Sequence, residues 1–271
     1  MELCEASYYQ WKKGEEKREK KQKQEQEQIL EVKAVFEESK KTYGCRRVKQ
    51  ALEKKGIVYS EWKIRRIMRE NGFYPITIRK YNPGRSGKSD GRYYDNIIKQ
   101  DFKANNPNEK WVGDITYLKT KLGWVYLAAV MDLYNREIIG YAVSKTIDAE
   151  LACRALRNAI VKSGRPKELL FHSDRGSQYC SKKYQSILNE YKITGSMSKA
   201  GYPYDNSCME SFFASMKKEC ISRREYATME MVEKDIFYYV EIFYNRKRLH
   251  SILGYLSPVA YRLKYLDHTT A

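Results

Sequence analysis

Three apolar runs follow one another closely between residues 111 and 144. They read WVGDITYLKT, WVYLAAVMD and REIIGYAVS, and the short connections between them contain Lys121-Leu122-Gly123 and Tyr134-Asn135. β-Branched and aromatic side chains favour strands, and connections of this length favour hairpins. The segment therefore predicts an antiparallel meander of three strands.

Helical and strand-like segments alternate after this meander. We expect a helix over 148–161, a short apolar strand over 168–173, a helix near 181–191, a brief strand over 193–197 and a helix that begins near Ser207. The order strand-strand-strand-helix-strand-helix-strand-helix is that of the ribonuclease-H-like α/β fold. The sequence therefore predicts a mixed five-stranded sheet with helices on both faces.

The N-terminal part of the chain has a helical pattern instead. Apolar residues share one face in each of three segments, namely Ile29, Val32 and Phe36, then Val48, Ala51 and Leu52, then Ile64, Ile67 and Met68. Three short helices in succession predict an all-helical module of the helix-turn-helix kind. Ser60 is expected to cap the third helix and Gly72 to end it.

Basic residues occupy the faces of the third helix that its apolar stripe leaves open. They are Lys63, Arg65, Arg66 and Arg69, and Arg46 and Arg47 add to them in the second segment. A recognition helix would present basic residues to DNA in this way, although a solvated basic face has the same pattern. The formal charge of +17 favours a polyanionic partner such as nucleic acid, and acidic lipid would also fit the charge alone.

Low-complexity and turn-rich segments separate the parts of the chain. A run of Lys, Glu and Gln near the N-terminus predicts a helical or flexible basic segment, and a stretch containing NPGRSGKSDG predicts a linker. The predicted organisation is a basic segment over 1–28, a DNA-binding module over 29–74, a linker over 75–104, an α/β core over 105–225 and a C-terminal helical extension over 226–271.

Several classes of protein are disfavoured by the sequence. No window approaches the roughly 20 apolar residues that span a bilayer, and the N-terminus lacks the apolar core of a signal peptide, so we expect a cytoplasmic protein with no membrane partner. The six cysteines form no C-x2-C pair, and the three histidines never approach zinc-binding spacing. We therefore expect reduced thiols and no zinc site.

Three acidic residues fall where the predicted fold would bring them together. Asp114 lies within the first strand, Asp174 at the carboxyl end of its expected parallel neighbour, and Glu210 in the first turn of the helix after the fifth strand. Two-metal phosphoryl chemistry needs several carboxylates at one point, because Mg²⁺ prefers oxygen ligands. An acid inside the apolar strand VGDITYL also needs a reason for its desolvation, and a bound metal would supply one.

Each of the three acids also has a structural interpretation. Ser207 and Glu210 fit a capping box, in which Glu210 would only stabilise the start of a helix. Asp174 fits a turn or a helix cap, and Asp114 could pair with a lysine.

Other polar residues lie near the predicted site. Asp132 and Asp205 are alternative ligands or turn formers, and His172 is expected to be structural and not a base. Lys217 lies two helical turns after Glu210 with Lys218 beside it, and both could hold DNA phosphates or simply be solvated.

The C-terminal extension begins with a helix at about Thr228. An apolar stripe predicts that this helix packs into the core, and it consists of Val232, Ile236, Tyr239 and Phe243. A basic cluster follows and could be either a DNA contact or a solvated turn: Arg246, Lys247, Arg248 and His250.

Four segments together resemble one protein family. WVGDITYL, FHSDRGSQY, GYPYDNSCMESFFASMKKE and YNRKRLHSILGYLSP are similar to the OrfB part of transposases from a large bacterial insertion-sequence family with two overlapping frames, OrfA and OrfB. ESKKTYGCRRVKQALEKKG and the helix after it resemble the family's N-terminal helical module. The resemblance covers nearly the whole chain, and the family in turn resembles retroviral integrases in its catalytic core.

The resemblance implies a D-D-35-E site at Asp114, Asp174 and Glu210, since 35 residues separate Asp174 from Glu210. It implies two Mg²⁺ or Mn²⁺ ions, cleavage by a metal-bound water at the end of the element, and attack of the freed 3′-OH on a second phosphodiester. The implied partners are double-stranded DNA of the terminal repeats and the target, the OrfA product or an OrfAB fusion, and further copies of the chain on DNA. The implied location is the bacterial cytoplasm, at the nucleoid.

Two departures from the family pattern and two other functions remain open. Gly113 stands where the family often has Thr, and Cys180 where Thr or Ser is common. A DNA-binding regulator, or an inactive remnant lacking its OrfA partner, would share the motifs. A ribonuclease acting on RNA:DNA hybrids would share the fold but would not need so much basic surface.

Overall fold

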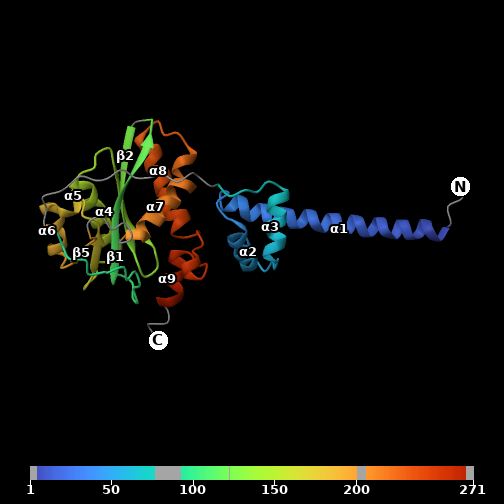
Figure 1. Cartoon of the computed structure of the whole chain (residues 1–271), viewed down its shortest axis with the longest axis horizontal. Helices are drawn as coiled ribbons and strands as arrows, with labels where there is room; N and C mark the ends of the chain where they lie inside the picture. Colours follow the sequence, from blue (N-terminus) through green and yellow to red (C-terminus); the bar gives the residue numbers. More distant parts are fainter. Residues whose placement is uncertain (1–4, 77–92, 122, 200–205, 267–271) are drawn as a thin grey trace. The chain divides into compact units, whose positions relative to one another are not determined.

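The computed structural model describes residues 5–76, 93–121, 123–199 and 206–266 (Figure 1). The chain divides into two compact units, Met1–Thr77 and Ile78–Ala271. The division falls inside the segment that the sequence predicts to be a linker. Among the described residues, no helix combines the length and apolar character that crossing a membrane requires.

The first unit contains three helices, α1 (Glu5–Glu38), α2 (Cys45–Lys54) and α3 (Glu61–Glu70). The predicted apolar faces are buried in all three, with Val32 and Phe36 on α1, Val48 and Leu52 on α2, and Ile64, Ile67 and Met68 on α3. The Ser60 hydroxyl caps α3 by accepting a hydrogen bond from the Lys63 amide (3.2 Å), and Gly72 follows the helix with a φ of +69°. The helical module is therefore confirmed.

The first helix is much longer than the sequence pattern indicates. It spans 34 residues without a break at residue 28, so the low-complexity run and the apolar segment after it form one helix. Lys, Glu and Gln are good helix formers, and they sustain the low-complexity part of the helix without any apolar stripe.

The second unit is built on a five-stranded sheet whose order is β3-β2-β1-β4-β5. The strands are β1 (Lys110–Thr120), β2 (Gly123–Asp132), β3 (Ile138–Ser144), β4 (Leu170–Ser173) and β5 (Thr194–Met197). β1 pairs antiparallel with β2 and β2 with β3, whereas β4 pairs parallel with both β1 and β5. The mixed sheet is the one that the sequence predicts.

Helices cover both faces of this sheet (Figure 1). The helical elements are α4 (Ala149–Lys162), α5 (Ser177–Cys180), α6 (Lys182–Glu190), α7 (Ser207–Glu219), η2 (Ile221–Arg223), α8 (Met229–Phe237), η3 (Tyr238–Tyr244), η4 (Ser251–Leu253) and α9 (Pro258–Leu266). In Figure 1, α4, α5 and α6 lie on one side of β1, and α7, α8 and α9 lie on the other.

Side-chain alternation along β1 decides which residues face which layer. Trp111 belongs to the core that α4, α5 and α6 form with the sheet, and Ile115 packs against the same core. Successive side chains of a strand point to opposite faces, so Val112, Asp114 and Thr116 face the other layer. That layer contains α7, the helix that carries Glu210.

Part of the predicted linker packs against the outer strand β5. The Ile97 amide donates to the Ser196 hydroxyl (2.9 Å), and the Met197 amide donates to the Asp95 carbonyl (3.3 Å). A Cβ on Gly195 would lie 2.7 Å from the ring of Tyr94, so glycine allows this close approach. The chain therefore joins the sheet well before residue 105.

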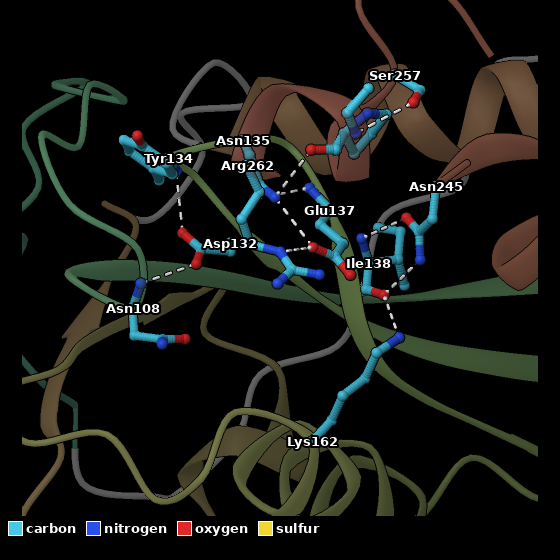
Figure 2. A network of polar contacts seen from close by, with 12 residues as sticks. Asn108, Asp132, Tyr134, Asn135, Glu137, Ile138, Lys162, Asn245, Ser257 and Arg262 are labelled. Atoms are coloured by element: carbon cyan, nitrogen blue, oxygen red, sulfur yellow. Dashed lines mark hydrogen bonds and ion pairs between the residues drawn. The ribbon is translucent and has the colours of Figure 1, made fainter. Parts of the chain in front are cut away.

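The C-terminal extension belongs to the same unit as the sheet. Its predicted apolar stripe is buried, as expected, although residues 238–244 form a π-helix and not a continuation of α8. A polar network ties the extension to the turn between β2 and β3 (Figure 2). Asn245 bonds both the amide and the carbonyl of Ile138 (3.0 and 2.9 Å), and Arg262 pairs with buried Glu137 (3.0 Å).

Candidate active site

Asp114 lies where β1 loses its neighbour. β4 pairs only with Lys110–Val112, so β1 is an edge strand at Asp114 while β2 still pairs with it on the other side. The Ile115 amide donates to Asp114 Oδ1 (2.7 Å). Burial raises the pKa of this carboxyl to about 8, and the negative charges of Asp174 and Glu210 act in the same direction.

Asp174 immediately follows β4, the parallel neighbour of β1. The Gly176 amide donates to its Oδ1 (2.9 Å), which opposes a rise in the Asp174 pKa that burial causes. A Cβ at position 176 would lie 2.9 Å from the same oxygen, so the glycine lets the backbone approach the carboxylate closely. This bond holds the carboxylate in the turn directly after β4.

Glu210 lies in the first turn of α7 and is exposed. The residue that precedes the helix is Asn206 and not Ser207, and its side chain makes no capping bond, so the capping box suggested by the sequence does not form. Instead, the buried Asn206 side chain donates to the Gly113 carbonyl (3.1 Å). This bond fixes the start of α7 beside β1, next to Asp114.

The three acids thus come from separate parts of the unit, and the charges of Asp174 and Glu210 both act on Asp114. Partial burial raises the pKa of Glu210, as it does that of Asp174, so all three carboxyls resist ionisation together. Like charges that are crowded in a desolvated place favour a cation between them. Among the described residues, however, no group of three or more acidic, histidine or cysteine side chains is arranged so that it could hold a metal ion.

The alternative residues have structural roles where the structure describes them. Asp132 is buried and accepts hydrogen bonds from the amides of Asn108 (2.8 Å) and Tyr134 (2.9 Å), so it shapes a turn (Figure 2). Burial raises the pKa of Asp132 to about 6. Asp205 lies outside the described residues.

His172 is a structural residue, as the sequence suggests. Its ring is fully buried in β4, with Nδ1 2.9 Å from the Ser196 hydroxyl and Nε2 3.2 Å from the Ser198 hydroxyl. Both contacts cross from β4 to β5 and its continuation, so the ring links the parallel strands.

Lys217 of α7 lies within electrostatic range of Asp114. Burial lowers the pKa of its ammonium group, and the negative charge of Asp114 opposes that shift. The Nζ atom also lies 4.7 Å from the ring centroid of Tyr117 on β1. Lys218, beside it, is exposed.

One predicted DNA contact has a different position in the structure. Arg248 is buried (6% exposed) and forms an ion pair with Glu219 (2.7 Å), and a further bond joins it to Ser215 (3.3 Å). A buried, paired guanidinium holds α7 to the C-terminal extension and presents no charge to DNA. Arg246, by contrast, is exposed and still fits the prediction.

The basic residues of the first unit are partly engaged with neighbours. Ion pairs hold Arg46 to Glu61 (3.7 Å), Arg65 to Glu61 (2.6 Å) and Arg66 to Glu25 (3.0 Å). Lys63 lies over the ring of Tyr59 (4.6 Å) and Arg47 over the ring of Tyr43 (5.8 Å). Arg69 is exposed. Exposed ion pairs of this kind are weak, so DNA phosphates could replace the carboxylates.

Comparison with known proteins follows the same division of the chain. Residues 104–203 match the Integrase core domain family, residues 210–266 match a second family of that description, and residues 23–81 match the HTH-like domain family. The chain is 41% identical over 235 residues to the transposase InsF for insertion sequence IS3A of Escherichia coli (strain K12), which covers 87% of this chain and 82% of that protein. The chain belongs to this transposase family. It is also 36% identical over 263 residues to the insertion element IS600 uncharacterized 31 kDa protein of Shigella sonnei, covering 97% and 96% of the two chains.

Two solved structures are similar at a lower sequence identity. The catalytic core domain of the HTLV-2 integrase in complex with magnesium matches 57% of this transposase and 95% of its own length, with 18% identity and a TM-score of 0.44. A chain in the structure of the simian T-cell lymphotropic virus intasome in complex with the PP2A regulatory subunit B56 gamma matches 79% of this chain and 70% of its own length, with 18% identity and a TM-score of 0.49.

Two residues that shape the site are missed by the sequence reasoning. Asn206 is polar and directly precedes a helix, which alone suggests only a cap. Gly176 lies two residues after Asp174, and a glycine so close to a strand-end acid is the only sequence signal of its role. Both matter because of contacts that only the tertiary structure reveals.

Proposed function

We propose that Asp114, Asp174 and Glu210 form the catalytic centre of a DDE-type transposase, which cleaves DNA at the ends of an insertion sequence and joins them to other DNA. The observation that carries the proposal is the environment of Asp114. Its carboxyl lies in an apolar strand at a free strand edge, and two further carboxylates raise its pKa. The charge of Lys217 lowers this pKa, but burial and the two other acids outweigh it, which favours a further cation at this place.

The donor set fits divalent metal, namely Mg²⁺ or Mn²⁺ as two ions. Carboxylate oxygens are the ligands that Mg²⁺ prefers, and Mg²⁺ retains waters and substrate phosphate beside one or two carboxylates. An incomplete protein cluster is therefore compatible with metal that DNA helps to hold. Metal bound there would supply a nucleophile at neutral pH and stabilise the charge that develops on the phosphodiester.

The chain's own residues would position the DNA around this centre. Lys217, between Asp114 and Tyr117, would bind a phosphate next to the cleaved bond, and exposed Lys218 would bind a phosphate further along. Arg69 and the paired arginines of α3 would hold the terminal repeat through the helical unit. The further partners that we propose are the OrfA product or an OrfAB fusion and other copies of this chain on the DNA, at the bacterial nucleoid.

The test is strand cleavage by the full-length chain with Mg²⁺ and a labelled duplex of the element's terminal repeat. Asp114→Asn, Asp174→Asn and Glu210→Gln should each reduce cleavage and strand transfer to background, while DNA affinity changes by less than about threefold. Glu230→Gln is the matched control, because Glu230 also lies in the first turn of a helix of this unit and is exposed. Its activity should equal that of the wild type.

A chain that only regulates transposition would behave differently in the same assay. It would bind the duplex and cleave nothing, both alone and with the OrfA product added. That result would contradict the proposal. Undiminished cleavage by one of the three variants would contradict the role of the residue that the variant changes.

A further inference from the structure

The hairpin of β1 and β2 carries an unusual group of side chains near its tip. Tyr117 lies directly opposite Tyr126, and Lys119 lies directly opposite Trp124. Residues that are directly opposite in an antiparallel pair point to the same face, so three aromatic side chains and a lysine share one surface. Trp124 is 48% exposed, so a large part of its indole ring faces solvent and is not packed into the core.

Lys217 connects this surface to the catalytic acids. Its Nζ lies 4.7 Å from the ring centroid of Tyr117, and it lies within range of the charge of Asp114. Asp114 and Tyr117 are three residues apart on one strand and so point to opposite faces. An ammonium group that is close to both lies at the edge of β1, where β4 has ended at Val112. The aromatic surface therefore lies next to the catalytic acids along the edge of β1.

The hairpin tip is held in place. The Lys121 amide donates to the Tyr226 carbonyl (3.2 Å), and the Lys121 ammonium group pairs with Glu225 (2.5 Å). The rings of Tyr117 and Trp124 meet edge to face, with centroids 5.2 Å apart and an interplanar angle of 86°. Rings fixed by packing lose little conformational entropy when they bind a ligand.

We propose that Tyr117 and Trp124, with Lys119 and Lys217 beside them, form a platform that stacks an unpaired nucleobase of the DNA strand next to the cleaved phosphodiester. Every base has a π-face, so stacking on an exposed indole would tolerate any sequence, and the two ammonium groups would neutralise the adjacent phosphates. The inference rests on the proposed function, because it assigns the DNA strand to the edge of β1 that carries Asp114. Charge complementarity favours DNA as the occupant over another protein, since the net charge of the chain is +17 and two lysines flank the rings.

The platform can be tested without cleavage. The full chain with Asp114→Asn is titrated by fluorescence anisotropy against two labelled probes, a blunt duplex and the same duplex with a single-stranded oligothymidylate tail. Trp124→Ala in this background should weaken binding of the tailed duplex about fivefold to tenfold and change the affinity for the blunt duplex by less than about twofold. Trp124→Phe, which retains a ring, should keep most of the affinity for the tail.

Phe237→Ala is the matched control. Phe237 is also an exposed aromatic residue of this unit (54% exposed) but lies on α8, and its removal should leave both affinities unchanged. Thermal melting of each variant checks folding, which an exposed indole should not affect. Equal loss of affinity for both probes, or no loss for either, would overturn the proposal.

Photocrosslinking gives a second, independent readout. A tail that contains 5-iodouracil should crosslink to Trp124 or Tyr117 on irradiation, as identified by peptide mass spectrometry. Crosslinks confined to other residues would overturn the platform, and so would a change of oligomeric state in Trp124→Ala, which would assign the surface to a second copy of the chain. Both assays use the Asp114→Asn chain, so their results do not depend on whether the wild type cleaves DNA. If the wild type cleaves DNA but the chain shows no preference for the tailed duplex, the platform is contradicted and the proposed function is not.

Discussion

The protonation of Asp114 is linked both to the stability of the folded chain and to the proposed binding of metal. Its pKa of about 8 in the folded chain lies above the ordinary value of 3.8, mainly because the folded chain buries it and secondly because Asp174 is near. Between these two values the folded state retains a proton that the unfolded state has lost. The free energy of unfolding therefore falls as pH rises from about 4 to about 8, and the raised pKa values of Asp174 and Glu210 act in the same direction.

This linkage predicts a pH-dependent response to metal. Without divalent ions, the melting temperature of the wild type should fall between about pH 5 and about pH 8, and it should fall less in Asp114→Asn. Added Mg²⁺ should raise the melting temperature of the wild type more at pH 8 than at pH 6, because ligands must lose their protons to bind metal. Differential scanning calorimetry measures both effects. Parallel pH curves for the two proteins would contradict the assigned pKa of Asp114.

Gly176 offers a second prediction at this scale. Its φ of −59° suits any residue, but an added Cβ would lie 2.9 Å from Asp174 Oδ1 and 3.0 Å from Gln178 Oε1. Gly176→Ala should therefore fold normally and displace the Asp174 carboxylate, which would reduce cleavage by roughly tenfold to a hundredfold. Ser177→Ala, at the exposed neighbour, should leave the cleavage rate unchanged. Wild-type rates in Gly176→Ala would show that the carboxylate is not held by this turn.

Among the elements, the strands and helices of the second unit follow directly from local pattern. The runs read as WVYLAAVMD and ELLFHS became β2 and β4 within two residues, because alternation and β-branched content decide a strand locally. The long α1 and the π-helix over 238–244 could not be predicted in the same way. The low-complexity part of α1 has no apolar stripe to mark it as a helix, and the π-helix depends on how Tyr239 and Tyr244 pack against Phe212 of α7.

Arg248 shows why charge alone is a poor guide to contacts between elements. In sequence it belongs to the same basic cluster as Arg246, and only the fold reveals that Glu219 of α7 lies opposite it. The side chains of Arg248 and Glu219 are 7% and 11% exposed, so removing one partner leaves a buried charge. A pair of this kind fixes the position of α7, and with it the helix that carries Glu210.

The two arginines therefore predict opposite results. Arg248→Ala should lower the free energy of unfolding by about 3 kcal/mol, because the charge of Glu219 would remain buried. Arg246→Ala should change stability by less than about 0.5 kcal/mol and, as an exposed phosphate contact, lower the slope of log affinity against log salt by about 1. Urea denaturation and DNA titration at several salt concentrations separate the effects. An Arg248→Ala chain as stable as the wild type but weaker on DNA would reverse our assignment.

At the scale of the whole molecule, the candidate acids could be predicted and their surroundings could not. Topology alone places Asp114 and Asp174 on parallel neighbouring strands, so a sequence that reveals the strand order also reveals their proximity. The tie from Asn206 to Gly113 and the platform at Trp124 depend on distances between elements far apart in the chain. Such distances follow from packing, which no local pattern reports.

The C-terminal extension is predicted from the sequence as a part separate from the α/β core, whereas in the structure it packs into the same unit. Phe212 of α7 packs edge to face on Tyr244 (4.9 Å), and Asn245 and Arg262 bond the turn before β3. A chain ending at Glu225 would expose these apolar surfaces and remove Arg262, the ion-pair partner of buried Glu137, so it should aggregate or unfold without cooperativity. A chain ending at Leu266 retains every one of these contacts and should melt like the full-length protein. Circular dichroism melting and size-exclusion chromatography compare the two, and a monodisperse, cleaving chain ending at Glu225 would show that α7 holds Glu210 in place unaided.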